Sequence, residues 1–132
     1  MSKNTVERTN ANENAVVTCK ADVTVAIPKG TAIVFSTTDY FITLPADQNT
    51  FTQGVTLEAH ASGVHECVSV ILPGPVLRVT AGEDAIVAGE LVNGDQATPG
   101  EWIVDTDDPA GFALTNGDDG DEIDICFVGE QY

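Results

Sequence analysis

Short apolar runs, separated by glycine and proline, set the pattern of this chain from Ala15 onward. Apolar and polar residues alternate within several runs, and β-branched residues are frequent, as is typical of β-strands. The glycines and prolines between the runs are typical of a sandwich or barrel. We therefore expect an all-β fold, a single compact antiparallel β-sandwich or β-barrel-like domain. The runs that predict strands are 23–27, 32–35, 40–44, 55–59, 64–72, 76–80, 102–104, 111–115 and 122–128.

Two of these runs predict buried positions. The run at 64–72 is apolar on both faces, which is typical of a central strand. In the run at 122–128, Ile123, Ile125 and Phe127 share one face and are predicted to lie in the core.

Two weaker patterns in the sequence bear on a possible helical turn and on a possible internal repeat. The segment Thr80 to Glu83 has the form of a helix capping box, which predicts a single helical turn there. The segments VTVAIPKGTAIV and LRVTAGEDAIV echo each other only faintly. That echo is too weak to predict an internal repeat.

The first fourteen residues differ from the rest of the chain. They are polar and lack the apolar core of a signal peptide. We expect residues 1–14 to form a flexible N-terminal arm that orders on a partner, and residues 15–132 to form the β-domain.

Acidic residues outnumber basic ones by 21 to 5, for a net charge of -16. All basic residues lie at or before Arg78, and the chain from Val79 onward holds none. This charge excludes nucleic-acid binding through a basic surface and argues against an anionic membrane as partner. Because salt screens such self-repulsion, the charge fits a setting rich in salt or multivalent cations.

The cysteines do not predict a disulfide framework. Cys19, Cys67 and Cys126 are odd in number and far apart, and Cys67 and Cys126 lie inside apolar runs. We expect all three to be reduced core residues, in a protein assembled in a reducing cytosol.

No motif for metal binding or catalysis is found. His60, His65 and Cys67 form one metal-like group, but zinc ligands usually occur in closer pairs, which favours ordinary strand residues. Asp105, Asp107 and Asp108 form one acidic loop, and a second holds Asn116, Asp118, Asp119 and Asp121; neither matches an EF-hand, which favours diffuse cation binding. No nucleophile elbow or phosphate-binding loop is present. We expect no catalysis, no cofactor and no specific metal.

The C-terminal half resembles the capsid cement, or head decoration, proteins of tailed viruses. The resemblance rests on a phrase from Ala81 to Val92, on Gly111, Ala113 and Leu114, and on a closing strand from Gly120 to Ile125. It covers LRVTAGEDAIVAGELVNGD, GEWIVD and GFALTNGDDGDEIDICFVG. Against this family, the segment from Phe41 to Gly54 reads as an insertion.

The resemblance implies a structural protein, without enzymatic activity, that is made in the host cytoplasm and lies on the outer capsid surface of the virion. The acidic excess adds the expectation of a halophilic or marine host. It implies a homotrimer that bridges subunits of the major capsid protein, and an N-terminal arm that makes capsid contact. The residues expected to make that contact are Lys3, Thr5, Val6 and Arg8. The trimer interface is expected in the apolar stretches 68–72 or 123–128.

Two other functions fit parts of the sequence. A dense acidic half can imitate DNA and inhibit a nucleic-acid-binding protein, although here the carboxylates cluster in glycine-rich turns. A cation-dependent carbohydrate-binding module would use the acidic loops together with Trp102 as a stacking platform for the sugar.

Overall fold

A computed structural model describes residues 15–22, 24–48, 50–62 and 67–129. The described residues form β-strands and connecting loops without a helix, which confirms the all-β prediction. No helix among them is long and apolar enough to span a bilayer. The strands are β1 Val16–Lys20, β2 Ala32–Phe35, β3 Ile42–Thr43, β4 Gly54–Thr56, β5 Cys67–Ile71, β6 Val76–Ala81, β7 Leu91–Gly94, β8 Glu101–Val104, β9 Gly111–Ala113 and β10 Glu122–Phe127.

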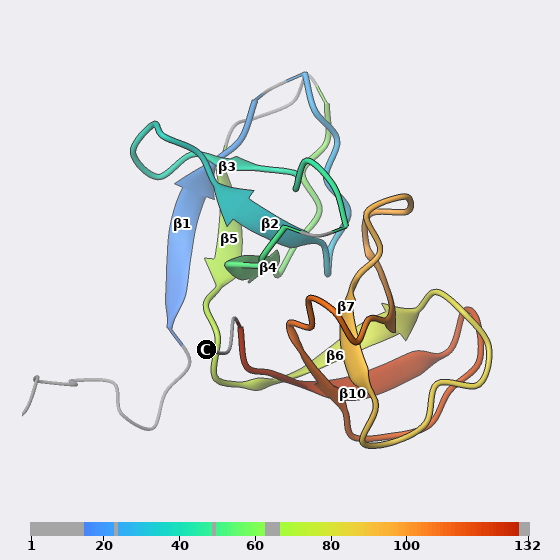
Figure 1. The fold of residues 1–132 in the computed structure, drawn as a ribbon. Coiled ribbons are helices and arrows are strands. Elements are labelled where there is room, and N and C mark those ends of the chain that lie inside the picture. The colour runs from blue at the N-terminus through green and yellow to red at the C-terminus, as the bar shows by residue number, and fades with distance from the viewer. Residues whose placement is uncertain (1–14, 23, 49, 63–66, 130–132) are drawn as a thin grey trace, which may run out of the picture.

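The strands divide into two units that follow each other along the chain (Figure 1). Strands β1 to β5 form the first unit, a five-stranded sheet with the order β1-β5-β4-β2-β3. Its edge strands approach each other at a parallel bridge between Lys20 and Phe41. Strands β6 to β10 form the second unit, a closed barrel with the order β10-β6-β8-β7-β9. Its pairs are antiparallel except β6 with β8.

The two units have the same topology and the same register. In the first, Ala32 pairs with Val55 and Val55 with Ile71. In the second, Leu91 pairs with Phe112 and Phe112 with Cys126. The isolated bridge of Ile27 to His60 likewise corresponds to that of Ile86 to Gly117. The chain therefore contains two copies of one structural unit, although the sequence did not predict an internal repeat.

The echo between the two sequence segments does not follow the register of the structural repeat. Their shared letters AIV, at 32–34 and 85–87, would match Ile33 with Ile86, whereas the bridges give Ile86 the position of Ile27. The segment from Phe41 to Gly54, expected as an insertion, also has a counterpart in the second unit. It contains β3, which corresponds to β8, and ends at the start of β4, which corresponds to β9.

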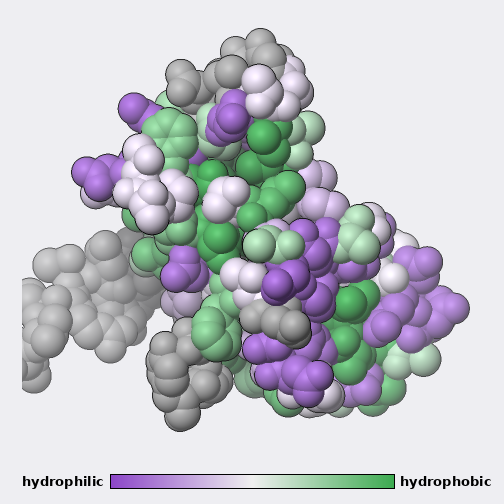
Figure 2. Space-filling view, turned by 45° about the horizontal axis from the view of Figure 1, so that its top comes forward, coloured by the Kyte–Doolittle hydropathy of each residue, from purple (hydrophilic) through white to green (hydrophobic). Residues whose placement is uncertain are grey.

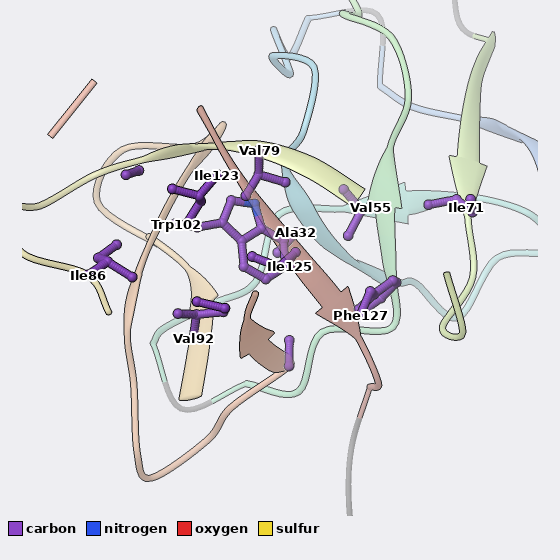
Figure 3. Packing of buried hydrophobic residues seen from close by; sticks show 13 residues of the cluster. Ala32, Val55, Ile71, Val79, Ile86, Val92, Trp102, Ile123, Ile125 and Phe127 are labelled. Carbon is purple, nitrogen blue, oxygen red and sulfur yellow. The ribbon is translucent and has the colours of Figure 1, made fainter. Parts of the chain in front are cut away.

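Each unit has its own apolar interior. One cluster lies inside the first unit and includes Cys19, Ile33, Ile42 and Val70. The other is larger and is centred on Trp102. It holds the predicted core residues Ile123, Ile125 and Phe127, and it also takes in three residues of the first unit, Ala32, Val55 and Ile71 (Figure 3). The second core is thus built from both units.

Some predicted elements differ from those observed. Of the run at 23–27, the described residues 24–27 form the bridge at Ile27 and no strand, because the chain turns there, with Val25 N donating to Asp22 O. Strands β1 and β7 were not among the predicted runs. The helical turn predicted from Thr80 to Glu83 is wrong, since β6 continues to Ala81 and Gly82 N donates to Trp102 O. Strand β5 is central, between β1 and β4, as predicted.

Candidate functional site

The four residues expected to contact a capsid, Lys3, Thr5, Val6 and Arg8, lie outside the described residues. Their role therefore stays a prediction. The functional candidates within the described part of the chain are the histidine and cysteine positions, the acidic loops, Trp102 and the outer faces of the two units.

His60 has a structural role. Its side chain is buried, and its Nδ1 lies 2.7 Å from the carbonyl oxygen of Val25. Because a carbonyl only accepts, Nδ1 carries the proton in this contact. His65 lies outside the described residues, so the predicted grouping with Cys67 is not observed as a whole. Among the residues described, no three His, Cys, Asp or Glu side chains are grouped so that they could hold a metal ion.

The cysteines lie in three different environments. Cys19 is fully buried, and burial raises the pKa of its thiol. Cys126 is half-buried on β10. Cys67 is exposed, which corrects the prediction that all three are core residues. The reason is its place at the first residue of β5, where its side chain alternates away from the buried Val68 and Val70.

In the first acidic loop, carboxylates stabilise the backbone of the loop itself. Asp105 Oδ1 accepts from the backbone nitrogens of Asp107 and Asp108, at 3.1 and 3.0 Å. These are local turn contacts of the kind that aspartate commonly makes.

The second acidic loop ties two segments of the second unit together. Asp118 Oδ1 accepts from Ala85 N, and Asp84 Oδ1 accepts from Asp119 N. Asp124, in the part of the chain without basic residues, forms an ion pair with a residue that is distant in sequence. Its Oδ1 lies 3.0 Å from Nε of Arg78, on the neighbouring strand β6. That pair is solvent-exposed and therefore contributes little stability.

Trp102 is fully buried and joins the two units. Its indole Nε1 donates to the carbonyl oxygen of Gly30, at 2.8 Å. It also packs edge-to-face against Phe127, with ring centroids 6.5 Å apart. A buried ring cannot stack on a sugar, so its predicted use as a carbohydrate platform is wrong.

A polar junction between the units surrounds Gln48. Its Nε2 donates to Gly94 O at 2.8 Å and to Asp105 Oδ2 at 3.1 Å, and its Oε1 accepts from Gln96 N. Nearby, Thr52 Oγ1 donates to Asn93 Oδ1, and both residues are buried. These bonds fix the orientation of one unit on the other.

The outer face of the second unit carries an apolar surface. A row of paired residues crosses four neighbouring strands: Leu91 on β7, Phe112 on β9, Cys126 on β10 and Val76 on β6. Leu91, Phe112 and Val76 are exposed, as is Leu114, two residues beyond Phe112. Leu91 and Phe112 also line a hollow of about 200 Å³. We call Val76, Leu91, Phe112, Leu114 and Cys126 the apolar face.

Acidic residues lie close to the apolar face in the chain. In the space-filling view, apolar patches on the lobe of the second unit are interrupted by hydrophilic ones (Figure 2). Glu90 precedes Leu91 in the chain, and Asp124 lies two residues from Cys126 on β10. An exposed apolar area with a charged rim is the usual form of a protein interaction surface.

This surface is not where the sequence placed an interface. Val68, Val70 and Ile71 are buried, as are Ile123, Ile125 and Phe127, so the stretches 68–72 and 123–128 belong mainly to the cores. Only Cys126 from those stretches lies on the apolar face. The signal that could have located it is the pairing of strands: Leu91 and Phe112 are far apart in sequence and meet only through the register of β7 and β9.

Comparisons with known proteins find a similar fold among solved structures but no similar sequence. No protein-family model matches the sequence, and no curated protein sequence matches it. Among solved structures, the chain is similar to the N base of the head fiber gp8.5 of bacteriophage phi29. The two share 18% sequence identity with a TM-score of 0.65, over 90% of this chain and 98% of that one. The two chains thus share a fold along almost their whole length.

Proposed function

We propose that this protein is a structural, non-enzymatic component of a tailed virus and decorates the outer surface of its capsid. The observation that carries the proposal is the similarity in fold to the base of a phage head fiber, which extends over 90% of this chain. The resemblance of the C-terminal half to head decoration proteins supports the same role from the sequence. At 18% identity, the fold and the sequence resemblance are separate lines of support.

In the proposed role, a homotrimer bridges neighbouring subunits of the major capsid protein. Residues 1–14 form the arm that contacts the capsid, through Lys3, Thr5, Val6 and Arg8, and residues 15–132 form the β-domain. A trimer touches several capsid subunits at once, so weak contacts combine into strong attachment through effective concentration. The net charge of -16 supports function at high salt, as in a halophilic or marine host.

Immunogold labelling tests whether the protein is on the virion. Antibodies raised against the purified chain are applied to intact virions of the virus that encodes it. We expect gold particles over the head, on particles that have not been opened. Labelling absent from intact virions but present in the lysate of infected cells would contradict the proposal and favour a soluble inhibitor such as a DNA mimic.

The proposed arm is tested by reversing its charge. A Lys3→Glu/Arg8→Glu variant is compared with a Lys20→Glu/Lys29→Glu variant, which makes the same charge change in the β-domain. We expect the arm variant to bind capsids at least tenfold more weakly and the β-domain variant to bind more strongly than the arm variant. Equal binding by the two variants would overturn the role of Lys3 and Arg8, and circular dichroism checks that both are folded.

A further inference from the structure

We propose that the hollow in the apolar face of the second unit is a binding site for an aromatic ring, and that the ring of Tyr132 from the same chain occupies it. Tyr132 thereby covers part of the apolar face in the free protein. The inference goes beyond the proposed function, because it concerns a contact within one chain and needs no capsid.

The hollow has the size and the lining that suit an aromatic ring. Its volume is about 200 Å³, and an apolar cavity of about 150 Å³ is large enough to bind benzene. None of the residues that line it has a polar side chain: they are Leu91, Pro109, Gly111, Phe112, Val128 and Gly129. Leu91 and Phe112 are exposed, so the hollow meets the solvent there. A tyrosine can therefore bury its ring in the hollow and keep its hydroxyl hydrated.

The chain itself leads to this hollow. Strand β10 ends at Phe127, and the next two residues, Val128 and Gly129, both line the hollow. Their backbone nitrogens donate to the carbonyl oxygen of Ala110, at 2.9 and 2.8 Å, which holds them beside the start of β9. Residues 130–132 therefore continue from a point at the hollow itself.

Tyr132 is the aromatic residue that this path brings within reach of the hollow. It follows Gly129 by three residues, and an extended chain spans at most about 3.6 Å per residue, so the two Cα atoms lie within about 11 Å of each other. A tether this short gives the ring an effective concentration in the millimolar range. The ring therefore occupies the hollow even if its affinity as a free molecule is low.

Other parts of the chain fit the hollow less well. Residues 1–14 contain no aromatic residue. The remaining aromatic residues, five Phe, one Trp and one Tyr, all lie within the described residues, and of these Phe112 alone lines the hollow. A second copy of the chain carries the same Tyr132 but lacks the short tether to this hollow. These comparisons favour Tyr132 of the same chain as the occupant.

Nuclear Overhauser effects in the full-length protein test the contact directly. We expect effects between the ring protons of Tyr132 and the methyl groups of Leu91 and Val128. The ring of Tyr40, which is exposed in the first unit, is the internal control and should show no effect to these methyl groups. A Tyr132 ring without an effect to either residue would overturn the proposal. In a mixture of labelled and unlabelled chains, effects that arise only between chains would overturn it in favour of a second copy.

Benzene binding tests whether the hollow is a site for an aromatic ring. Tyr132→Ala removes the proposed occupant, and Tyr40→Ala makes the same change at an exposed ring of the first unit. Tyr132→Phe keeps a ring at position 132. Benzene is titrated into each full-length variant, and its binding is followed by the chemical shifts of the methyl groups of Leu91 and Val128.

We expect Tyr132→Ala to bind benzene at least tenfold more tightly than Tyr40→Ala, and Tyr132→Phe to bind it as weakly as the unaltered protein. A tenfold difference means that Tyr132 occupies the hollow about 90% of the time. Equal binding by Tyr132→Ala and Tyr40→Ala, or no binding by either, would overturn the proposal. No capsid is present, so the result is separate from failure of the decoration function.

Discussion

The indole nitrogen of Trp102 donates a 2.8 Å hydrogen bond to the carbonyl oxygen of Gly30, and this contact links the core of one unit to a turn of the other. The ring itself is fully buried against Phe127. At the equivalent position of the first unit stands Ile42, which is buried but cannot donate such a bond. The two units therefore share an arrangement of strands, but only the second has a side-chain donor at this position that bonds to the other unit.

Replacing this tryptophan tests how strongly the units are coupled. Trp102→Phe removes the donor, leaves Gly30 O without this partner and opens space in the core. An unsatisfied buried group costs about 1–3 kcal/mol, and the lost volume adds to it. We expect the free energy of unfolding in urea to fall by about 2–4 kcal/mol. Tyr40→Phe, at an exposed ring, is the control and should change it by about 0.5 kcal/mol or less. Equal effects would contradict the structural role of Trp102.

Val55 and Phe112 hold equivalent positions but differ in exposure, so the same change should destabilise the protein far more at Val55 than at Phe112. Val55→Asp buries an unpaired charge in the second core, which costs several kcal/mol and should leave the chain unfolded. Phe112→Asp lies at an exposed position and should change the free energy of unfolding by about 1 kcal/mol or less. Thermal unfolding followed by circular dichroism distinguishes them. A folded Val55→Asp variant would show that the second unit does not cover the first.

Gly111 and Gly54 are also equivalent, and both sit where strands approach closely. A Cβ on Gly111 would collide with the carbonyl oxygen of Cys126, whereas one on Gly54 would lie 2.6 Å from a side-chain atom, Cγ1 of Val70. Because a backbone oxygen in a sheet yields less than a side chain, Gly111→Ala should be the more damaging. We expect it to cost about 1–3 kcal/mol or more, and Gly54→Ala to cost less. Urea unfolding of both variants decides the order.

The cysteines should react in the order of their exposure. Cys67 is exposed, Cys126 half-buried and Cys19 buried, with a raised thiol pKa. A disulfide reagent such as DTNB should therefore label Cys67 first and Cys19 only after unfolding. Mass spectrometry of digested protein identifies the labelled residue at each time. Fast labelling of Cys19 in folded protein would contradict its place in the core.

The raised pKa of Cys19 also gives a direction with pH. The folded protein holds its thiol proton to higher pH than the unfolded chain does. The Cys19 thiol therefore adds no pH dependence to the free energy of unfolding below the thiol's ordinary pKa, and it lowers that free energy as pH rises above this value. Between neutral and alkaline pH, the free energy of unfolding in urea should decrease less for Cys19→Ala than for the unaltered protein. An unchanged alkaline slope would show that Cys19 does not contribute.

The strand positions could be predicted where the alternation of side chains was strong. The inward faces of β5 and β10, with Val68, Val70, Ile123 and Ile125, follow directly from the sequence. Strand β7 was missed because its residues read as LVNG, and a polar asparagine and a glycine hide the pattern. Asn93 is nevertheless buried, because Thr52 of the other unit donates to its side chain. Such compensation comes from a distant segment and leaves no local signal.

The repeat could not be predicted because equivalent positions share shape more than residue type. Cys19 and Val79 are equivalent, and Ile42 and Trp102 are equivalent, with all four buried. Any apolar residue of suitable size fills such a position, so identity is lost while the register is kept. The apolar face was missed because Leu91 and Phe112 are far apart in sequence and are brought together only by the pairing of β7 with β9.

Binding of the purified chain to capsids tests the central claim most directly. Capsids are prepared from the virus that encodes the chain, with its gene deleted, and the full-length protein is added at increasing concentration in molar salt. After sedimentation, we expect saturable binding to intact capsids and, by electron cryomicroscopy, added density on the outer surface. Intact capsids that bind no protein at any concentration, or density only inside the shell, would contradict a role in capsid decoration.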